Sequence, residues 1–206
     1  MRRNHWVMAV LLSGVIFTVL GLANTSTNEP FLPGESPLPP PTQTEGEEAY
    51  EKVVAVLSHK RCVNCHPSGD RPRQGEDSHI HNFNVQRGPD NHGMAAVKCQ
   101  TCHQEENNNL SGVPGAPEWH LAPLKMKWEG LTKAEIARSI LNPENNGGRT
   151  LEETVHHLTE HPLVLWAWEP GVDASGNPRE KPPVPVDEYI EAVKTWAAAG
   201  TPIPED

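Results

Sequence analysis

Two copies of one five-residue pattern constrain this chain more than any other feature of its sequence. Residues 62–66 read Cys-Val-Asn-Cys-His and residues 99–103 read Cys-Gln-Thr-Cys-His. Each copy is C-x-x-C-H, the pattern to which a c-type haem is attached. Two thiols at this spacing can each form a thioether with one vinyl group of a porphyrin, and the adjacent imidazole can then ligate the iron. The pair predicts two covalently bound haem c groups, held by Cys62, Cys65, Cys99 and Cys102, with His66 and His103 as proximal iron ligands.

Other uses of paired cysteines fit the sequence less well. A structural zinc site built from two C-x-x-C pairs usually separates the pairs by about 15–20 residues, and the separation here is longer. A thioredoxin-like dithiol requires a strand-to-helix setting and has no use for the adjacent histidine. The two motifs use all four cysteines of the chain, which favours haem attachment over both alternatives.

The first 43 residues contain two segments that we expect to lie outside the folded domain. Residues 1–23 are a short basic head with Arg2 and Arg3 followed by an apolar run, which predicts a signal peptide or an N-terminal membrane anchor. Residues 24–43 contain six prolines and predict a flexible linker. We therefore expect a periplasmic protein, soluble or tethered to the inner membrane by an uncleaved N-terminal segment, with no other membrane contact.

Residues 44–206 predict one mainly α, loop-rich cytochrome c-type domain, built around the two haems, with little or no sheet. Hydrophobic residues are 36% of the chain and 21 residues are proline, so we expect the haems to supply part of the apolar interior. Apolar periodicity and helix-start signals predict helices over residues 44–59, 132–141, 150–160 and 187–199. Capping boxes are expected at Thr44, Thr132 and Thr150, and residues 163–168 are expected to form a short strand or a buried turn.

The charge balance indicates the class of partner. The formal net charge is −10, and removal of residues 1–23 with their two arginines would leave 15 basic and 27 acidic residues, or −12. Such a surface argues against nucleic acid and predicts redox protein partners with basic docking surfaces.

The sixth ligand of each iron is less clearly encoded. For the first haem the sequence favours His81, with His92 and then His79 as alternates, because these histidines lie in the loop between the motifs. For the second haem it favours His120, with Met126 as the alternate, and ligation of either haem across the pair also stays open. Three further histidines are expected to have helix-surface or capping roles: His156, His157 and His161. Two imidazoles would give a lower reduction potential than a His/Met pair.

Several short runs resemble a known family: residues 62–69, 84–90, 119–123, 128–131 and 146–150. The motif pair is similar to that of small bacterial dihaem cytochromes c over about residues 47–200. More narrowly, these runs resemble dihaem cytochromes whose members are often labelled isoquinoline 1-oxidoreductase subunits. The resemblance implies an electron-transfer role and the haem-binding residues of the two motifs. It also implies a molybdenum hydroxylase as a partner whose electrons leave through the cytochrome.

Two classes of function follow from these motifs. The first, which we favour, is an electron carrier that is not itself an enzyme, with both irons six-coordinate. The alternative is a dihaem enzyme of peroxidase type with one open iron, but such enzymes are considerably longer, whereas both motifs here lie within residues 62–103. A haem-based gas sensor would need an output domain, and the sequence contains none that we recognise.

Overall fold

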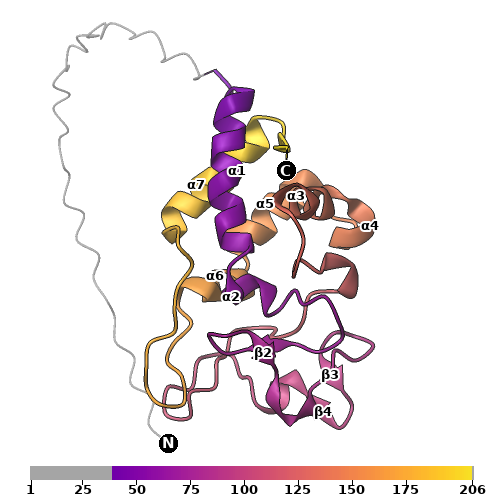
Figure 1. Cartoon of the computed structure of the whole chain (residues 1–206), viewed down its shortest axis with the longest axis vertical. Helices are drawn as coiled ribbons and strands as arrows, with labels where there is room; N and C mark the ends of the chain where they lie inside the picture. Colours follow the sequence, from indigo (N-terminus) through magenta and orange to yellow (C-terminus); the bar gives the residue numbers. More distant parts are fainter. Residues whose placement is uncertain (1–38, 206) are drawn as a thin grey trace, which may run out of the picture. The chain divides into compact units, whose positions relative to one another are not determined.

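The structure, a computed structural model, describes residues 39–205, which belong to one compact unit. The predicted signal peptide or anchor at residues 1–23, and most of the predicted linker at 24–43, lie outside the described residues. Helices gather at one end of this unit, whereas the two small hairpins and both C-x-x-C-H motifs lie toward the other end (Figure 1). Within residues 39–205 no helix is long and apolar enough to cross a membrane.

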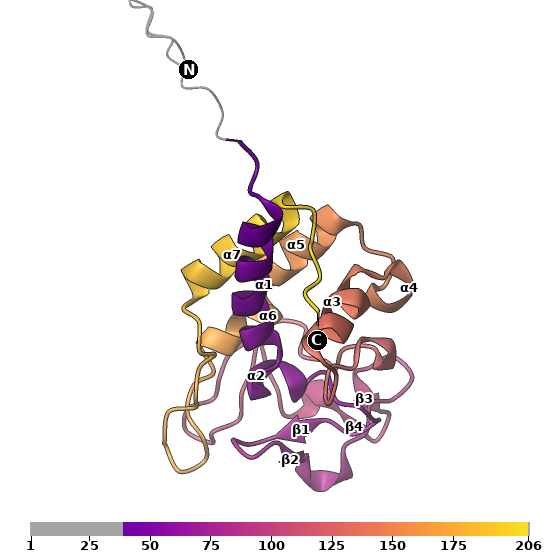
Figure 2. The same cartoon turned by 45° about the horizontal axis from the view of Figure 1, so that its top comes forward.

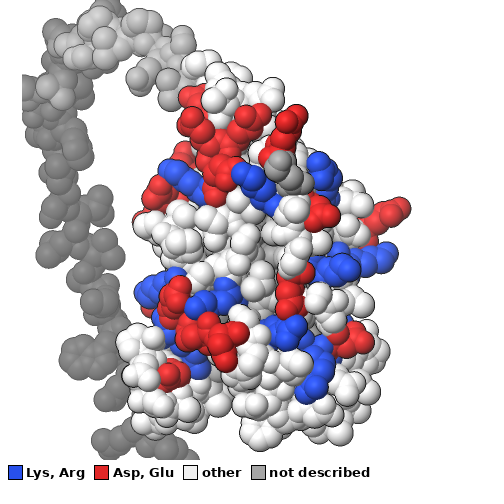
Figure 3. Space-filling model, viewed as in Figure 1, with Lys and Arg blue, Asp and Glu red and all other residues white. Residues whose placement is uncertain are grey.

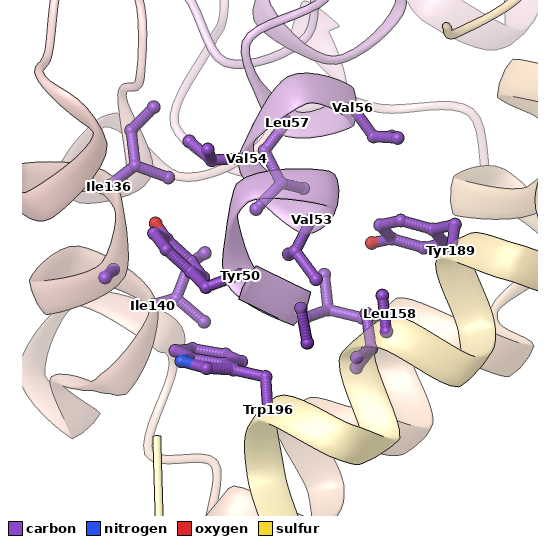
Figure 4. Packing of buried hydrophobic residues seen from close by; sticks show 14 of the residues in the cluster. Tyr50, Val53, Val54, Val56, Leu57, Ile136, Ile140, Leu158, Tyr189 and Trp196 are labelled. Carbon is purple, nitrogen blue, oxygen red and sulfur yellow. The ribbon is translucent and has the colours of Figure 1, made fainter. Parts of the chain in front are cut away.

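The hydrophobic core forms where the first and last helices meet. α1 (Gln43–Leu57) and α7 (Val186–Ala198) lie side by side in both views, with α3 (Lys133–Leu141) and α5 (Leu151–Glu160) beside them (Figure 2). Tyr50 and Trp196 pack against each other at the centre, with ring centroids 4.9 Å apart and the ring planes tilted by 33° (Figure 4). The apolar periodicity that predicts the last helix is confirmed as a buried apolar stripe, since Tyr189, Val193 and Trp196 are completely buried.

Capping boxes start the helices, as the sequence predicts, but one box is displaced. The boxes at Thr132 and Thr150 are confirmed. The first box uses Thr42 and Glu45, so the prediction that Thr44 and Glu47 form it was wrong by two residues. Both pairs satisfy the T-x-x-E pattern. The first turn of the helix packs against the C-terminal segment. Gly46 in this turn is buried, and a Cβ there would lie 2.5 Å from the Cβ of Ala199.

The loop-rich end is built from very short elements. α2 (Lys60–Val63) leads into the first motif, and two antiparallel hairpins follow, β1 (Arg73–Gln74) with β2 (His79–Ile80) and β3 (Gly93–Met94) with β4 (Val97–Lys98). Single 3-10 turns complete the region: η1 (Asn82–Asn84), η2 (Cys99–Thr101) and η3 (Leu124–Met126). The expectation of a mainly α fold with little sheet is therefore confirmed.

Residues 163–168 are helical turns. α4 (Pro143–Asn146) and α5 precede α6 (Pro162–Leu165), and η4 (Trp166–Trp168) follows it. The imidazole of His161 accepts a hydrogen bond from the Leu163 N–H at 3.3 Å, and Pro162 occupies the first helical position. This cap explains why the apolar run forms a helical turn and not a strand. It also confirms the capping role expected of His161.

Candidate functional site

Both C-x-x-C-H motifs fold into the same kind of turn. The N–H of His66 bonds to the carbonyl of Cys62 at 3.0 Å, and the N–H of His103 bonds to the carbonyl of Cys99 at 3.0 Å. Positions i, i+3 and i+4 of a helical turn share one face. Each motif therefore brings its two thiols and its imidazole to one side of a short segment, as attachment to a single flat group requires.

The cysteines are not arranged as a reactive dithiol or as one zinc site. All four are free thiols. Burial raises the pKa of Cys62 to about 12 and that of Cys65 to about 11, whereas a catalytic dithiol needs a lowered pKa. Within residues 39–205 no group of three or more His, Cys, Asp or Glu side chains is placed to hold a metal ion, so the two cysteine pairs do not converge on a shared tetrahedral site.

The two motif histidines are held in matching surroundings. The Nδ1–H of His66 donates to the carbonyl of Met126 at 2.6 Å, and that of His103 donates to the carbonyl of Pro114 at 2.7 Å. A carbonyl oxygen only accepts, so in both rings the proton is on Nδ1 and the lone pair is on Nε2. Histidines that ligate a metal through one ring nitrogen usually donate the N–H of the other to a carbonyl or a carboxylate in this way. Burial lowers the pKa of His66 to about 4 and lowers that of His103, which keeps both rings neutral at pH 7.

A tryptophan lies flat against each of these rings. Trp128 stacks on His66 with centroids 3.5 Å apart and an interplanar angle of 8°. Trp119 stacks on His103 at 4.5 Å and 6°. No role was predicted for Trp119 or Trp128 from the sequence, although both lie in runs that carry the family resemblance. Each stack fixes the rotation of the imidazole about its Cβ–Cγ bond, so the position of Nε2 is set by packing.

The predicted distal candidates divide between the two motifs. His81 lies beside His103, with ring centroids 6.0 Å apart and an interplanar angle of 70°. His120 lies near enough to His66 to contribute to the lowering of the His66 pKa, after burial and Arg87, and it stacks on His92 at 4.9 Å and 19°. The sequence-based pairing of His81 with the first haem and His120 with the second stays a prediction, and the geometry groups these residues the other way round.

The alternates occupy different surroundings. His79 is exposed and its Nδ1 lies 2.6 Å from the carboxylate of Asp77. The thioether sulfur of Met126 accepts a hydrogen bond from the Ser139 hydroxyl at 3.7 Å, while its backbone carbonyl holds His66. Met126 therefore contacts the first motif through its main chain.

The protonation of Nδ1 separates two groups of histidines. Five rings donate Nδ1–H to a backbone carbonyl and so carry an available Nε2: His66, His81, His92, His103 and His120. In His59 and His161, by contrast, Nδ1 accepts from a backbone N–H at the start of a helix. The first group contains both proximal candidates and three of the predicted distal ones. Sequence alone cannot make this division, because it depends on which carbonyl each ring meets.

His157 departs from the sequence-based expectation. It was expected to have a helix-surface or capping role; it is half-buried, and burial lowers its pKa to about 3, with Arg149, His161 and His66 adding to the effect. It lines a cleft of about 390 Å³ together with Arg149, Glu152, Glu153, His156 and His161. His156, as expected, is exposed, and its ring lies 3.3 Å from the carboxylate of Glu160.

The surroundings of the first motif suit a bound group that carries carboxylates. The Nε1–H of Trp128 is buried and makes no hydrogen bond within residues 39–205. The backbone N–H of Trp128 bonds to the carbonyl of His66, so this ring lies beside the motif. Arg87 bonds to the carbonyl of Ala122, whose own N–H bonds to the carbonyl of Cys65, and the Nε of Arg87 lies 3.8 Å from the carboxylate of Asp70. A buried donor without an acceptor is costly. A propionate of a haem would be an acceptor for the Trp128 Nε1–H.

No family model, curated protein or solved structure matches this chain. The function is therefore inferred from the geometry of the two motifs and from the chemistry of their residues.

Proposed function

We propose that this protein is an exported dihaem c-type cytochrome that carries electrons between a periplasmic or membrane redox enzyme and a downstream acceptor. One observation carries the proposal: both C-x-x-C-H motifs have the same turn, the same Nδ1–carbonyl bond and a tryptophan stacked on the histidine. One such arrangement could be ordinary packing. The same arrangement is repeated at the only two C-x-x-C-H motifs in the sequence, which supports the proposal that both motifs bind the same kind of group.

The residues of the chain have defined roles in this proposal. A bound haem c supplies the one-electron iron couple. The four motif cysteines would hold it by thioethers, and His66 and His103 would ligate iron through Nε2. The carbonyls of Met126 and Pro114 keep the Nδ1 protons in place, which fixes the tautomer and raises the basicity of Nε2. The two tryptophan stacks keep the rings from turning, so the ligand geometry stays the same when the electron arrives or leaves.

The charge distribution supports a partner with a basic surface. Acidic side chains gather over the beginning of α1 on the face shown in Figure 3, where Glu45, Glu48 and Glu51 are exposed. This end lies away from the hairpins and motifs (Figure 1). We infer that it orients an approaching basic partner by long-range attraction, while electrons pass through the motif end. The molybdenum hydroxylase implied by the family resemblance is one enzyme that such a carrier would serve.

A specific asymmetry favours one alternative function. His103 has a second imidazole in ring contact, whereas His66, within the described part of the chain, is in ring contact only with Trp128. His157, whose pKa is lowered by burial with a contribution from His66, lines an open cleft. An open iron at His66 would make the protein a dihaem enzyme of peroxidase type.

Haem content and carbon monoxide binding test the proposal together. The chain is produced with a haem-attachment system, its haem is measured by alkaline pyridine, and the reduced protein is exposed to carbon monoxide. We expect two covalent haems per chain, and one in the double variant C62S/C65S. No spectral change with carbon monoxide supports the carrier, and a change in half of the haem supports the alternative. Fewer than two haems in the unaltered chain would refute both.

A further inference from the structure

We propose that His81 is the axial ligand opposite His103 on the iron of the second haem. The ligand thus comes from the hairpin that follows the first motif, and it crosses to the second. This inference rests on the proposed function, because it assigns the sixth coordination position of a haem that the second motif is proposed to hold. It replaces our sequence-based assignment of His81 to the first haem.

The separation of the two rings carries the argument. Each iron–imidazole nitrogen bond is about 2 Å, and each nitrogen lies about 1 Å from its ring centroid, so two imidazoles on opposite sides of one iron have centroids about 6 Å apart. The rings of His81 and His103 are 6.0 Å apart. The stacked rings of His92 and His120 are 4.9 Å apart and nearly parallel, which is too close for two ligands on opposite sides of one iron.

The protonation of the two rings fits the same reading. His81 donates its Nδ1–H to the carbonyl of Asn82 at 2.8 Å, and His103 donates its own to Pro114. In the neutral form of each ring the lone pair is therefore on Nε2, and two such nitrogens cannot hydrogen-bond to each other. No hydrogen bond joins these two rings, both of which lie in the described part of the chain. A metal between them would use both lone pairs.

The backbone around His81 is fixed by the hairpin before it. In the β1–β2 pair Gln74 is opposite His79, and the N–H of His81 extends the ladder by bonding to the carbonyl of Pro72 at 2.9 Å. Asn82 then donates its N–H to the Gln74 side chain at 3.0 Å. His81 is thus held on both sides by main-chain bonds, so its ring position does not depend on a free loop.

The chain after His81 is strained in a way that suits a functional position. Phe83 and Asn84 have φ values of 61° and 54°, two successive non-glycine residues in the left-handed region. Such conformations persist where the surroundings impose them, and they concentrate at ligand clamps and active sites. Phe83 is also 85% exposed, so burial of its own ring does not account for the strain.

The angle between the rings predicts a spectroscopic signature. At 70° the two imidazole planes are close to perpendicular. Perpendicular axial imidazoles give a low-spin ferric haem a strongly anisotropic electron paramagnetic resonance signal with a large maximum g value, whereas parallel planes give an ordinary rhombic signal. We expect the large-g signal from one haem of the intact protein.

The first test replaces His81 in the two-haem protein. H81A should retain two haems per chain, lose the large-g signal, and bind carbon monoxide at one more haem than the unaltered protein does. Added imidazole should reverse both changes. The matched control is H79A, two residues earlier, exposed and bonded to Asp77, which should leave ligation unchanged. If H81A lowers haem content, H81M retains a ligand and should show the charge-transfer band of a sulfur-ligated ferric haem.

The second test identifies which haem His81 ligates. C62S/C65S carries only the haem of the second motif, and H81A added to it should convert that haem from unreactive to reactive toward carbon monoxide. If H81A instead acts only in C99S/C102S, His81 belongs to the first haem and the inference is wrong. Should these single-haem chains not accumulate, dipolar contacts between the His81 and His103 ring protons in the paramagnetic proton spectrum of the intact protein decide the same point.

The outcomes separate this inference from the proposed function. Two haems with unchanged ligation in both H81A and H81M would overturn the inference alone. Absence of covalent haem in the unaltered chain would overturn the proposed function, and the inference with it.

Discussion

Two buried tyrosines allow a test in which similar substitutions are expected to have opposite effects. Tyr50 and Tyr189 are both completely buried. The hydroxyl of Tyr50 donates to the carbonyl of Lys133 at 2.7 Å, whereas the hydroxyl of Tyr189 makes no hydrogen bond within residues 39–205. The Tyr189 ring packs against Trp168 at 4.9 Å. Replacing either tyrosine with phenylalanine keeps the ring and removes only the hydroxyl.

The expected changes follow from the state of each hydroxyl. A buried polar group without a partner costs about 1–3 kcal/mol, and a satisfied hydrogen bond contributes about 1 kcal/mol. Y189F should therefore raise the free energy of unfolding by about 1 kcal/mol or more. Y50F should lower it by about 1–3 kcal/mol, because the Lys133 carbonyl loses its donor. For a domain of this size each 1 kcal/mol shifts Tm by about 2–4 °C.

Guanidinium unfolding of the oxidised protein, followed by circular dichroism, measures both changes. The slopes of the two transitions should match that of the unaltered chain, so that midpoints report stability. A Y189F protein that is destabilised as much as Y50F would refute the reasoning. It would show that the Tyr189 hydroxyl has a partner in the folded protein, and the proposed haem would be a candidate because Tyr189 lies near Cys62, whose charge adds to burial in raising the Tyr189 pKa.

Three further changes test the helix start, the hairpin and a buried histidine. T132A removes the capping oxygen of α3 and should lower the free energy of unfolding by about 1 kcal/mol, measured by the same denaturant titration. G93A should destabilise more than G130A: both positions have positive φ, but only at Gly93 would a Cβ lie 2.4 Å from a carbonyl, that of Val97. Equal losses in the two glycine variants would contradict the clash. Burial lowers the pKa of His157 from 6.5 to about 3, so between these pH values the unfolded chain binds a proton that the folded chain does not. Its contribution to stability is therefore complete above pH 6.5 and is lost as pH falls toward 3, by up to about 1.4 kcal/mol per unit. H157Q should flatten the decline in stability across pH 4–6, and an unchanged slope would show that His157 titrates normally.

The parts of the fold that the sequence predicts correctly are those with local causes. Capping boxes at Thr132 and Thr150 and the apolar stripe on α7 are short-range patterns, and each forms where expected. The start of α1, by contrast, could not be predicted from the local sequence pattern alone. Two overlapping boxes satisfy the same pattern, and the structure has the earlier one, with Gly46 packed beneath the C-terminal segment at Ala199 and Pro202.

For the candidate site, the sequence by itself predicts the chemistry of the proposed haem attachment. The spacing of Cys62, Cys65 and His66, and its repeat at residues 99–103, places two thiols and an imidazole on one helical turn, whatever surrounds them. The residue types of the sixth ligands were also limited by the sequence to a few histidines and one methionine.

Only the tertiary structure decided which imidazole meets which motif. His81 is nearer to the first motif along the chain, yet the β1–β2 hairpin holds it 6.0 Å from the ring of His103. The carbonyls that fix the tautomers of His66 and His103 come from Met126 and Pro114, 60 and 11 residues away. Attachment depends on neighbours within one turn of backbone, so sequence spacing encodes it. Axial ligation depends on two rings meeting across a space set by hairpins and long-range packing, and no local pattern specifies that distance.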